Sequence, residues 1–297
     1  MVYEEFKEWH PHKPTLKRLE QVQKIIAYYK TLGLLLTVRQ IHYQLVSTNA
    51  YENTQSNYDS MTRMLTNARM SGRLDWSAIV DRNRETRRSY FDDSVKDAIR
   101  SALRCFGRDK MLYQDVYIEV MIEKMAIFEI VERVTNKYNI RLTGDKGFCS
   151  TTILYEIAGR MKEQTREGKK CYVLYIGDHD PSGLTMDESI KNTLARMGAN
   201  GVNFIRVGLT KEQVEKYNLP PNMLKEGNTN SKKYAKKHGE VSWECDALPP
   251  EVLQNDLEDN ILSLINYSTY EYMLKLEKEG KEQLENIINK LEAQGAY

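Results

Sequence analysis

The sequence predicts an α/β protein in which a helical N-terminal domain precedes a mainly parallel β-sheet. In residues 1–110 apolar side chains recur at helical spacing, whereas in residues 111–297 short apolar runs alternate with amphipathic segments. The charge changes at the same point, with 19 Lys and Arg against 13 Asp and Glu before it and 24 against 29 after it. A first part of about +6 suits a protein that binds a polyanion, although solvated surface charge gives the same count.

Three helices are expected in the N-terminal part. Apolar residues repeat at helical spacing from Leu16 to Tyr29, and Gly33 ends this segment. A second helix follows Thr37, an N-cap residue type, and a third covers NYDSMTRMLTNARMSG. Three short helices with an arginine-rich edge are typical of helix-turn-helix or winged-helix modules, and of many other small helical domains. The arginines of this edge are Arg63, Arg69, Arg73, Arg82, Arg84, Arg87 and Arg88.

The second helix carries a tyrosine in an unusual place. Val38, Ile41 and Leu45 form one apolar stripe at 100° per residue, and Tyr43 lies roughly opposite it. Arg39, four residues earlier, is its neighbour on the same face. We therefore expect Tyr43 to point away from the core, beside a guanidinium group.

From residue 111 onward, strands and helices alternate. A strand is expected at 115–123, followed by the helical sequence KMAIFEIVERVTNKYN. The segments IRLTG, CYVLYIG and NFIRVGL then read as strands, separated by helices in TTILYEIAGRMKEQ and from about Leu184. This alternation favours a parallel sheet with helices on both faces, in which ligands bind beyond the carboxyl ends of the strands.

Acidic residues follow two of these strands. The sequence YIGDHDPSG places Asp178 and Asp180 directly after a strand, and Glu123 ends another. Two carboxylates this close repel unless a basic side chain or a metal ion lies between them. Carboxylate oxygens at one edge of a sheet favour a divalent metal, Mg²⁺, held by these residues and water.

Other interpretations of this loop stay open. An EF-hand requires a helix before the loop and a glutamate at its twelfth position, where Ser189 stands. An aspartate-nucleophile phosphatase also places two aspartates after a strand, usually the first of its domain. A purely structural alternative is an Asp-rich turn that caps the helix after Gly183.

Taken together, several motifs resemble one family. VMIEKMAIF resembles the glutamate motif of a Toprim domain, and YIGDHDPSG resembles its D-x-D motif. This form is similar to the A subunit of type IIB topoisomerases and to Spo11 proteins. TGDKGFCS resembles a K-G motif between the two, and TVRQIHY resembles the motif of the DNA-cleaving tyrosine in a winged-helix domain. WECDALPPE is similar to short phage- and plasmid-borne relatives.

The resemblance implies a winged-helix-type domain over 1–110 and a Toprim domain with a C-terminal helical extension over 111–297. It makes Tyr43 the nucleophile that forms a phosphotyrosine ester with DNA, with Arg39 lowering its pKa or binding the phosphate. Asp178 and Asp180 would hold one or two Mg²⁺ ions, and Glu123 would be a metal ligand or the general acid/base. The DNA contacts implied or expected are Arg63, Arg69, Arg73, Lys124 and Lys146.

The same resemblance implies a homodimer in which Tyr43 of one subunit works with the acidic residues of the other. Because the sequence contains no ATP-binding signature, any ATPase of the GHKL type would be a separate partner subunit. His42 departs from the aromatic residue that the family has before its tyrosine. A metal-dependent nuclease without a covalent intermediate and a non-catalytic DNA-binding protein remain alternatives.

The composition adds a cellular context. The four cysteines show no ligand spacing and are interpreted as free thiols in a reducing cytoplasm. No apolar run approaches the length of a membrane span, so we expect no membrane partner. The basic segment NTNSKKYAKKHG at 228–239 suits either a DNA-contacting loop or a solvated one.

Overall fold

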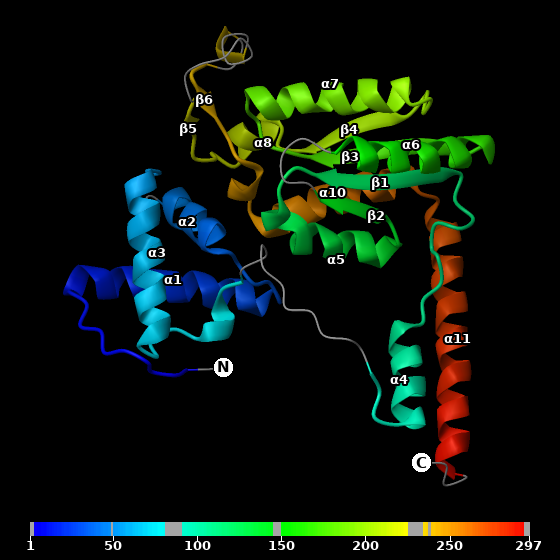
Figure 1. The fold of residues 1–297 in the computed structure, drawn as a ribbon, viewed down its shortest axis with the longest axis horizontal. Coiled ribbons are helices and arrows are strands. Elements are labelled where there is room, and N and C mark those ends of the chain that lie inside the picture. The colour runs from blue at the N-terminus through cyan, green and yellow to red at the C-terminus, as the bar shows by residue number, and fades with distance from the viewer. Residues whose placement is uncertain are drawn as a thin grey trace.

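A four-stranded parallel sheet lies at the centre of the larger part of the protein (Figure 1). The structure is a computed structural model that describes residues 3–48, 50–80, 91–144, 150–224, 234–236 and 239–293. The strand order is β2-β1-β3-β4, and every neighbouring pair is parallel, which confirms the predicted α/β class. The strands are β1 (Val116–Ile122), β2 (Arg141–Gly144), β3 (Lys170–Ile176) and β4 (Asn203–Gly208).

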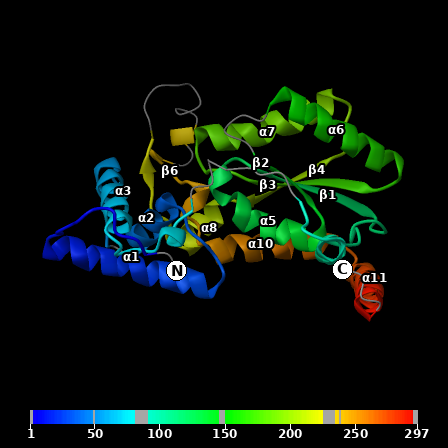
Figure 2. The ribbon, with the colours of Figure 1, turned by 60° about the horizontal axis from the view of Figure 1, so that its bottom comes forward.

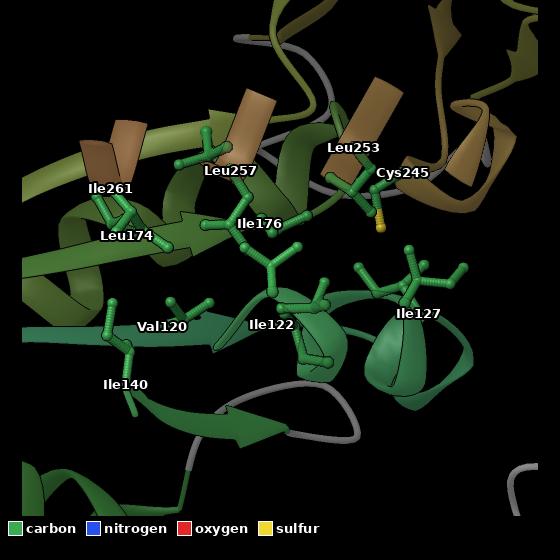
Figure 3. Packing of buried hydrophobic residues seen from close by; sticks show 14 of the residues in the cluster. Val120, Ile122, Ile127, Ile140, Leu174, Ile176, Cys245, Leu253, Leu257 and Ile261 are labelled. Carbon is green, nitrogen blue, oxygen red and sulfur yellow. The ribbon is translucent and has the colours of Figure 1, made fainter. Parts of the chain in front are cut away.

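Helices cover both faces of the sheet because the strand side chains alternate between two apolar cores. Val120, Ile122, Leu174 and Ile176 face one core, where they meet α10, as Figure 3 shows. The intervening strand residues, such as Val173, belong to the other core. The first face is covered by α5 (Phe128–Tyr138) and α10 (Pro250–Leu264), and the second by α6 (Thr151–Arg166) and α7 (Pro181–Arg196).

Three helices form the N-terminal part, close to their predicted bounds: α1 (Lys13–Thr31), α2 (Val38–Ser47) and α3 (Gln55–Met70). Thr37 is the N-cap of α2 and forms a capping box with Gln40, as its residue type indicated. Gly33 and Gly72 follow α1 and α3 with positive φ, which glycine adopts without strain. Over 3–48 and 50–80 the β structure consists of single bridges, so the winged-helix assignment stays a prediction, as does the Toprim assignment.

A two-helix arm extends from the sheet (Figure 1). Its helices are α4 (Val95–Cys105) and the longer α11 (Tyr267–Ala293), which contact each other. Although α4 falls inside the range predicted for the first domain, it packs against the C-terminal helix. Glu277 of α11 accepts a hydrogen bond from the Arg108 N–H and forms ion pairs with Lys110 and Lys281.

The N-terminal helices lie beyond the carboxyl ends of the strands, next to the β5–β6 hairpin, in both views (Figures 1 and 2). Helix α2 contacts the short 3₁₀ helix η3 (Cys245–Ala247), which follows this hairpin. The hairpin consists of β5 (Asn222–Met223) and β6 (Val241–Ser242), and the remaining short elements are η1 (Trp76–Ala78), η2 (Met125–Ile127) and α8 (Lys211–Lys216). None of the helices in the described ranges combines the length and apolar character that crossing a bilayer requires.

Candidate active site

The carboxyl ends of β1 and β3 bring Glu123 and the Asp178 loop together. These strands are neighbours in register, so the residues that follow them leave the sheet side by side. The Glu123 Oε2 atom accepts a hydrogen bond of 2.8 Å from the Asp178 N–H. Burial raises the pKa of Glu123 to about 7, and the Asp178 and Asp180 carboxylates add to this effect.

Each aspartate of the loop already has hydrogen-bonding partners. Asp178 accepts from the Cys245 N–H through Oδ1 at 2.8 Å and pairs with Lys124 Nζ through Oδ2 at 2.9 Å. Asp180 is the N-cap of α7 and accepts from the Gly183 N–H at 2.6 Å. The capping role thus applies to Asp180, and α7 begins at Pro181, before the expected start near Leu184, because proline suits the first helical turn.

Two glycines allow this close approach. A Cβ atom on Gly183 would lie 2.2 Å from the Asp178 carbonyl oxygen, and one on Gly177 would lie 2.6 Å from Glu123 Oε2. Arg206 of β4 holds the loop from behind, donating to the carbonyl oxygens of Gly177 and Gly183 at 3.0 Å each. The backbone path of the loop therefore depends on glycine at 183, where the close atom belongs to the backbone, whereas at 177 the close atoms belong to side chains.

Lys124 is the cation among these carboxylates. Its ammonium lies 2.9 Å from Asp178, 2.7 Å from Glu244 and 3.3 Å from Asp246. Burial alone lowers the pKa of Lys124, but the carboxylates, with Asp246 and Asp178 foremost, raise it above its usual value. Burial raises the pKa of Asp246 to about 6, and its Oδ2 atom has no hydrogen-bond partner among the described residues. A basic side chain, one of the two possibilities left open by the sequence, lies next to Asp178.

Oxygens of the predicted magnesium ligands have partners within the protein in this structure. Carboxylate oxygens are the ligands that Mg²⁺ prefers. However, the Lys124 ammonium occupies Asp178 Oδ2, and Asp180 Oδ1 is used in capping α7. Within the described ranges, no group of three His, Cys, Asp or Glu side chains is placed to hold a metal ion. Glu123, Asp178 and Asp180 therefore share one edge of the sheet, and their binding of Mg²⁺ stays a prediction.

Tyr43 reaches the same edge from α2. It belongs to none of the apolar cores, as its place opposite the Ile41 stripe indicated, but only 4% of it is exposed. The hydroxyl accepts a hydrogen bond of 3.4 Å from Asn222 Nδ2. Burial raises the pKa of Tyr43, with Asp246 and Glu244 adding to this effect and Arg39 opposing it. Arg39 lowers the pKa of this phenol, as the resemblance implied, but burial and the carboxylates outweigh the guanidinium.

Arg39 lies beside Tyr43 but binds elsewhere. Its guanidinium donates to Glu244 Oε2 at 2.7 Å and lies 5.5 Å from the centre of the Tyr58 ring. Burial lowers the pKa of Arg39, but the Glu244 and Asp246 carboxylates raise this pKa by more than burial lowers it. The guanidinium therefore stays charged. His42 is buried and contacts the rings of Tyr43 and Tyr58, so its role in this structure is packing.

Glu244 is the main residue that sequence reasoning missed. It joins both parts of the protein, because it accepts from Arg39 of α2, from Lys124 after β1 and, at 3.2 Å, from Asn222 of β5. Burial raises the pKa of Glu244, but Lys124, Arg39 and a hydrogen bond from Tyr43 outweigh burial and lower this pKa to about 2. The available signal was the sequence WECDALPPE, where Glu244 and Asp246, separated by one residue, come after a short strand.

The predicted DNA-contacting arginines lie away from this edge. Arg63 and Arg73 are exposed, and Arg69 stacks on the Trp76 ring at 5.4 Å. Asn53, just before α3, contacts Asn222, so Arg69 in the last turn of α3 lies about 20 Å along the helix from this contact. Arg73 follows the end of this helix. The other expected basic residues, Arg82, Arg84, Arg87, Arg88 and Lys146, and most of 228–239 are outside the described residues.

No protein-family model matches this chain, and neither does any curated protein or solved structure with which it was compared. Function is therefore inferred from the motifs and from the geometry of this edge.

Proposed function

We propose that this chain cleaves and rejoins duplex DNA through a phosphotyrosine intermediate on Tyr43, in the manner of type IIB topoisomerase A subunits. The observation that carries the proposal is the position of one phenol. Tyr43, from the basic N-terminal part, lies at the carboxyl edge of the parallel sheet with Glu244 and Lys124. A phenol, two cations and several carboxylates at one edge are suitable groups for phosphoryl transfer.

In the proposed reaction, the Tyr43 oxygen attacks a backbone phosphorus atom. The new Tyr–O–P bond forms as the bond from phosphorus to the 3′ oxygen breaks. The phenolic proton passes to a base, and the leaving 3′ oxygen takes up a proton. Arg39 and Lys124 would neutralise charge on the phosphate, and Glu123 is the residue proposed to exchange the proton with the 3′ oxygen. Attack of the 3′ hydroxyl on the ester reverses each bond change and rejoins the strand.

Mg²⁺ is part of the proposal through the chemistry of Glu123, Asp178 and Asp180, whose oxygens are hard ligands. When bound, the ion would stabilise negative charge on the phosphate. The partners proposed are duplex DNA, a second copy of the chain and a separate ATPase subunit. The basic charge of residues 1–110 supports the first of these.

The test is incubation of the protein with supercoiled plasmid and Mg²⁺, quenched with denaturant to trap protein on DNA ends. We expect wild type to give nicked or linear plasmid bound to protein, and Tyr43→Phe to give neither. Tyr138→Phe is the matched control, because this buried tyrosine also donates to a carboxylate, that of Glu258. Plasmid cleavage that persists in Tyr43→Phe overturns the proposal.

One observation favours a second candidate, a nuclease in which water is the nucleophile. The Tyr43 hydroxyl is buried, and its raised pKa makes it a poor nucleophile in the present arrangement. For this candidate, cleavage survives Tyr43→Phe, is lost in Asp178→Asn, and never leaves protein attached to DNA.

Subunit complementation tests the proposed homodimer. Tyr43 contacts Glu244 of its own chain in this structure, whereas the family resemblance implies that Tyr43 works with the acidic residues of a partner chain. If the active site forms across the dimer, mixing Tyr43→Phe with Glu123→Gln restores one complete site and nicks plasmid. No recovery, with dimers verified, contradicts an active site shared between subunits.

A further inference from the structure

We infer that the Glu244 carboxylate occupies a phosphate-binding site of this protein and must be displaced by the DNA backbone. The site consists of Arg39, Lys124 and Asn222, with the Tyr43 hydroxyl beside it. The identity of the ligand as DNA rests on the proposed function, whereas the site itself rests on the contacts of one carboxylate.

The donors converge from three separate segments. Arg39 NH1 and Lys124 Nζ each lie 2.7 Å from Glu244 Oε2, and Asn222 Nδ2 lies 3.2 Å from Oε1. They come from α2, from the end of β1 and from β5. Two cations on one oxygen and an amide on the other form a binding site for an anion with two oxygens on one central atom. A phosphodiester has the same arrangement in its two non-bridging oxygens.

The cations are fixed by contacts besides those with Glu244. Lys124 also pairs with Asp178 and Asp246, and the Arg39 guanidinium lies over the Tyr58 ring. These contacts hold both groups in place when Glu244 moves away. A cation that is held in position loses less conformational entropy when a phosphate binds.

The site is also accessible from solvent. The Arg39 side chain is 43% exposed, and the Glu244 and Lys124 side chains are 24% and 23% exposed. Asp246, by contrast, is completely buried. A phosphate can therefore replace the Glu244 carboxylate without entering the interior of the protein.

Displacement has a consequence for Tyr43. Helix α2 contacts η3, Arg39 of α2 pairs with Glu244 just before η3, and Asn53 hydrogen-bonds to Asn222 of β5 at 2.5 Å. Asn222 Nδ2 donates both to Glu244 Oε1 at 3.2 Å and to the Tyr43 hydroxyl at 3.4 Å. When a phosphate takes this amide, the Tyr43 hydroxyl loses the hydrogen bond from Asn222. The same event that binds the backbone then releases the phenol beside it.

The test is binding of a fluorescein-labelled 20-bp duplex at several salt concentrations, measured by fluorescence anisotropy in EDTA. Glu244→Gln keeps the size of the side chain but removes its charge. We expect about tenfold tighter binding, because Arg39 and part of the Lys124 charge become available. The slope of log affinity against log salt should steepen by about 1, the contribution of one further phosphate. Arg39→Ala added to Glu244→Gln should remove this gain.

Glu258→Gln is the matched control, because Glu258 of α10 also accepts from a lysine and a tyrosine, Lys137 and Tyr138 of α5. Unchanged binding in Glu244→Gln, or an equal gain in Glu258→Gln, overturns the inference. Hydrogen exchange of the wild type provides a second test that needs no variant. The duplex should increase amide exchange in 241–247, and protection of this segment contradicts displacement.

These outcomes separate the inference from the proposed function. Tighter binding in Glu244→Gln without any covalent adduct on Tyr43 supports the phosphate site and rejects the phosphotyrosine reaction. An adduct on Tyr43 with unchanged duplex binding in Glu244→Gln supports the reaction and rejects the site.

Discussion

Replacement of Lys124 by methionine should destabilise the protein strongly. Removing one partner of a buried ion pair costs about 3 to 5 kcal/mol, because the remaining charge stays buried. Without Lys124, Asp178 still accepts a hydrogen bond from the Cys245 N–H, and Glu244 still accepts one from Arg39. Asp246 is therefore the carboxylate that loses most of its stabilising interactions. Its Oδ1 atom hydrogen-bonds to Lys124 and its Oδ2 atom has no hydrogen-bond partner within the described ranges.

We therefore expect Lys124→Met to cost about 4 kcal/mol, or about 8 to 16 °C in melting temperature for a domain of this size. The assay is thermal unfolding by circular dichroism at pH 7.5 and low salt. Lys124→Met combined with Asp246→Asn should recover a large part of the loss, since the second change removes the unpaired charge. Lys137→Met is the control, because that lysine is 53% exposed and its pair with Glu258 is worth less than about 1 kcal/mol.

A loss in Lys124→Met no larger than that in Lys137→Met would refute the reasoning on the buried cluster. The same holds if Asp246→Asn adds to the loss instead of relieving it. Either result would mean that the lysine is not the cation on which these carboxylates depend.

Three further predictions concern other parts of the structure. Gly183→Ala should lower the free energy of unfolding in urea by more than about 3 kcal/mol, because the new Cβ meets a backbone oxygen at 2.2 Å. Gly159→Ala is the control: its Cβ has open space, so this change should stabilise α6 by about 0.5 to 1 kcal/mol. Arg206→Lys should lower the melting temperature and raise backbone exchange at 177–183, since one ammonium cannot replace the planar donors that bind Asp187 and the loop carbonyls. Burial opposes ionisation of Glu277, but Lys281, the Arg108 N–H and Lys110 lower its pKa to about 2, so its contribution to stability is present above about pH 4.5 and is lost as pH falls toward 2. The acid-unfolding curve of Glu277→Gln should lack this component, and identical curves would contradict the assignment.

Local signals predicted much of the fold. The spacing of apolar residues placed α1, α2 and α3, and Thr37 fixed the start of α2. Strand segments bounded by helical ones gave all four strands of the sheet and their parallel orientation, but not their order in the sheet. These features depend on residues close together in the sequence, and so a single sequence reveals them. The arm of α4 and α11 was not predicted, because its packing joins segments about 170 residues apart.

The site was predictable only in part, for the same reason. The rule that parallel strands end at one edge placed Glu123 near Asp178. Helical periodicity predicted that Tyr43 points away from the apolar stripe of α2. It did not predict that Asn222 of β5 would contact the Tyr43 hydroxyl. The position of Glu244, 120 residues after Lys124, is set by tertiary packing, and no local pattern indicates which charges it meets.

The covalent attachment site of DNA tests the central claim most directly. Wild-type protein is quenched with denaturant during plasmid cleavage, digested with nuclease and protease, and its peptides are analysed by mass spectrometry. The account predicts one nucleotide-bearing peptide, modified on Tyr43, that requires Mg²⁺ and disappears in Tyr43→Phe. Cleaved plasmid with no modified peptide, or with the nucleotide on another residue, would contradict it.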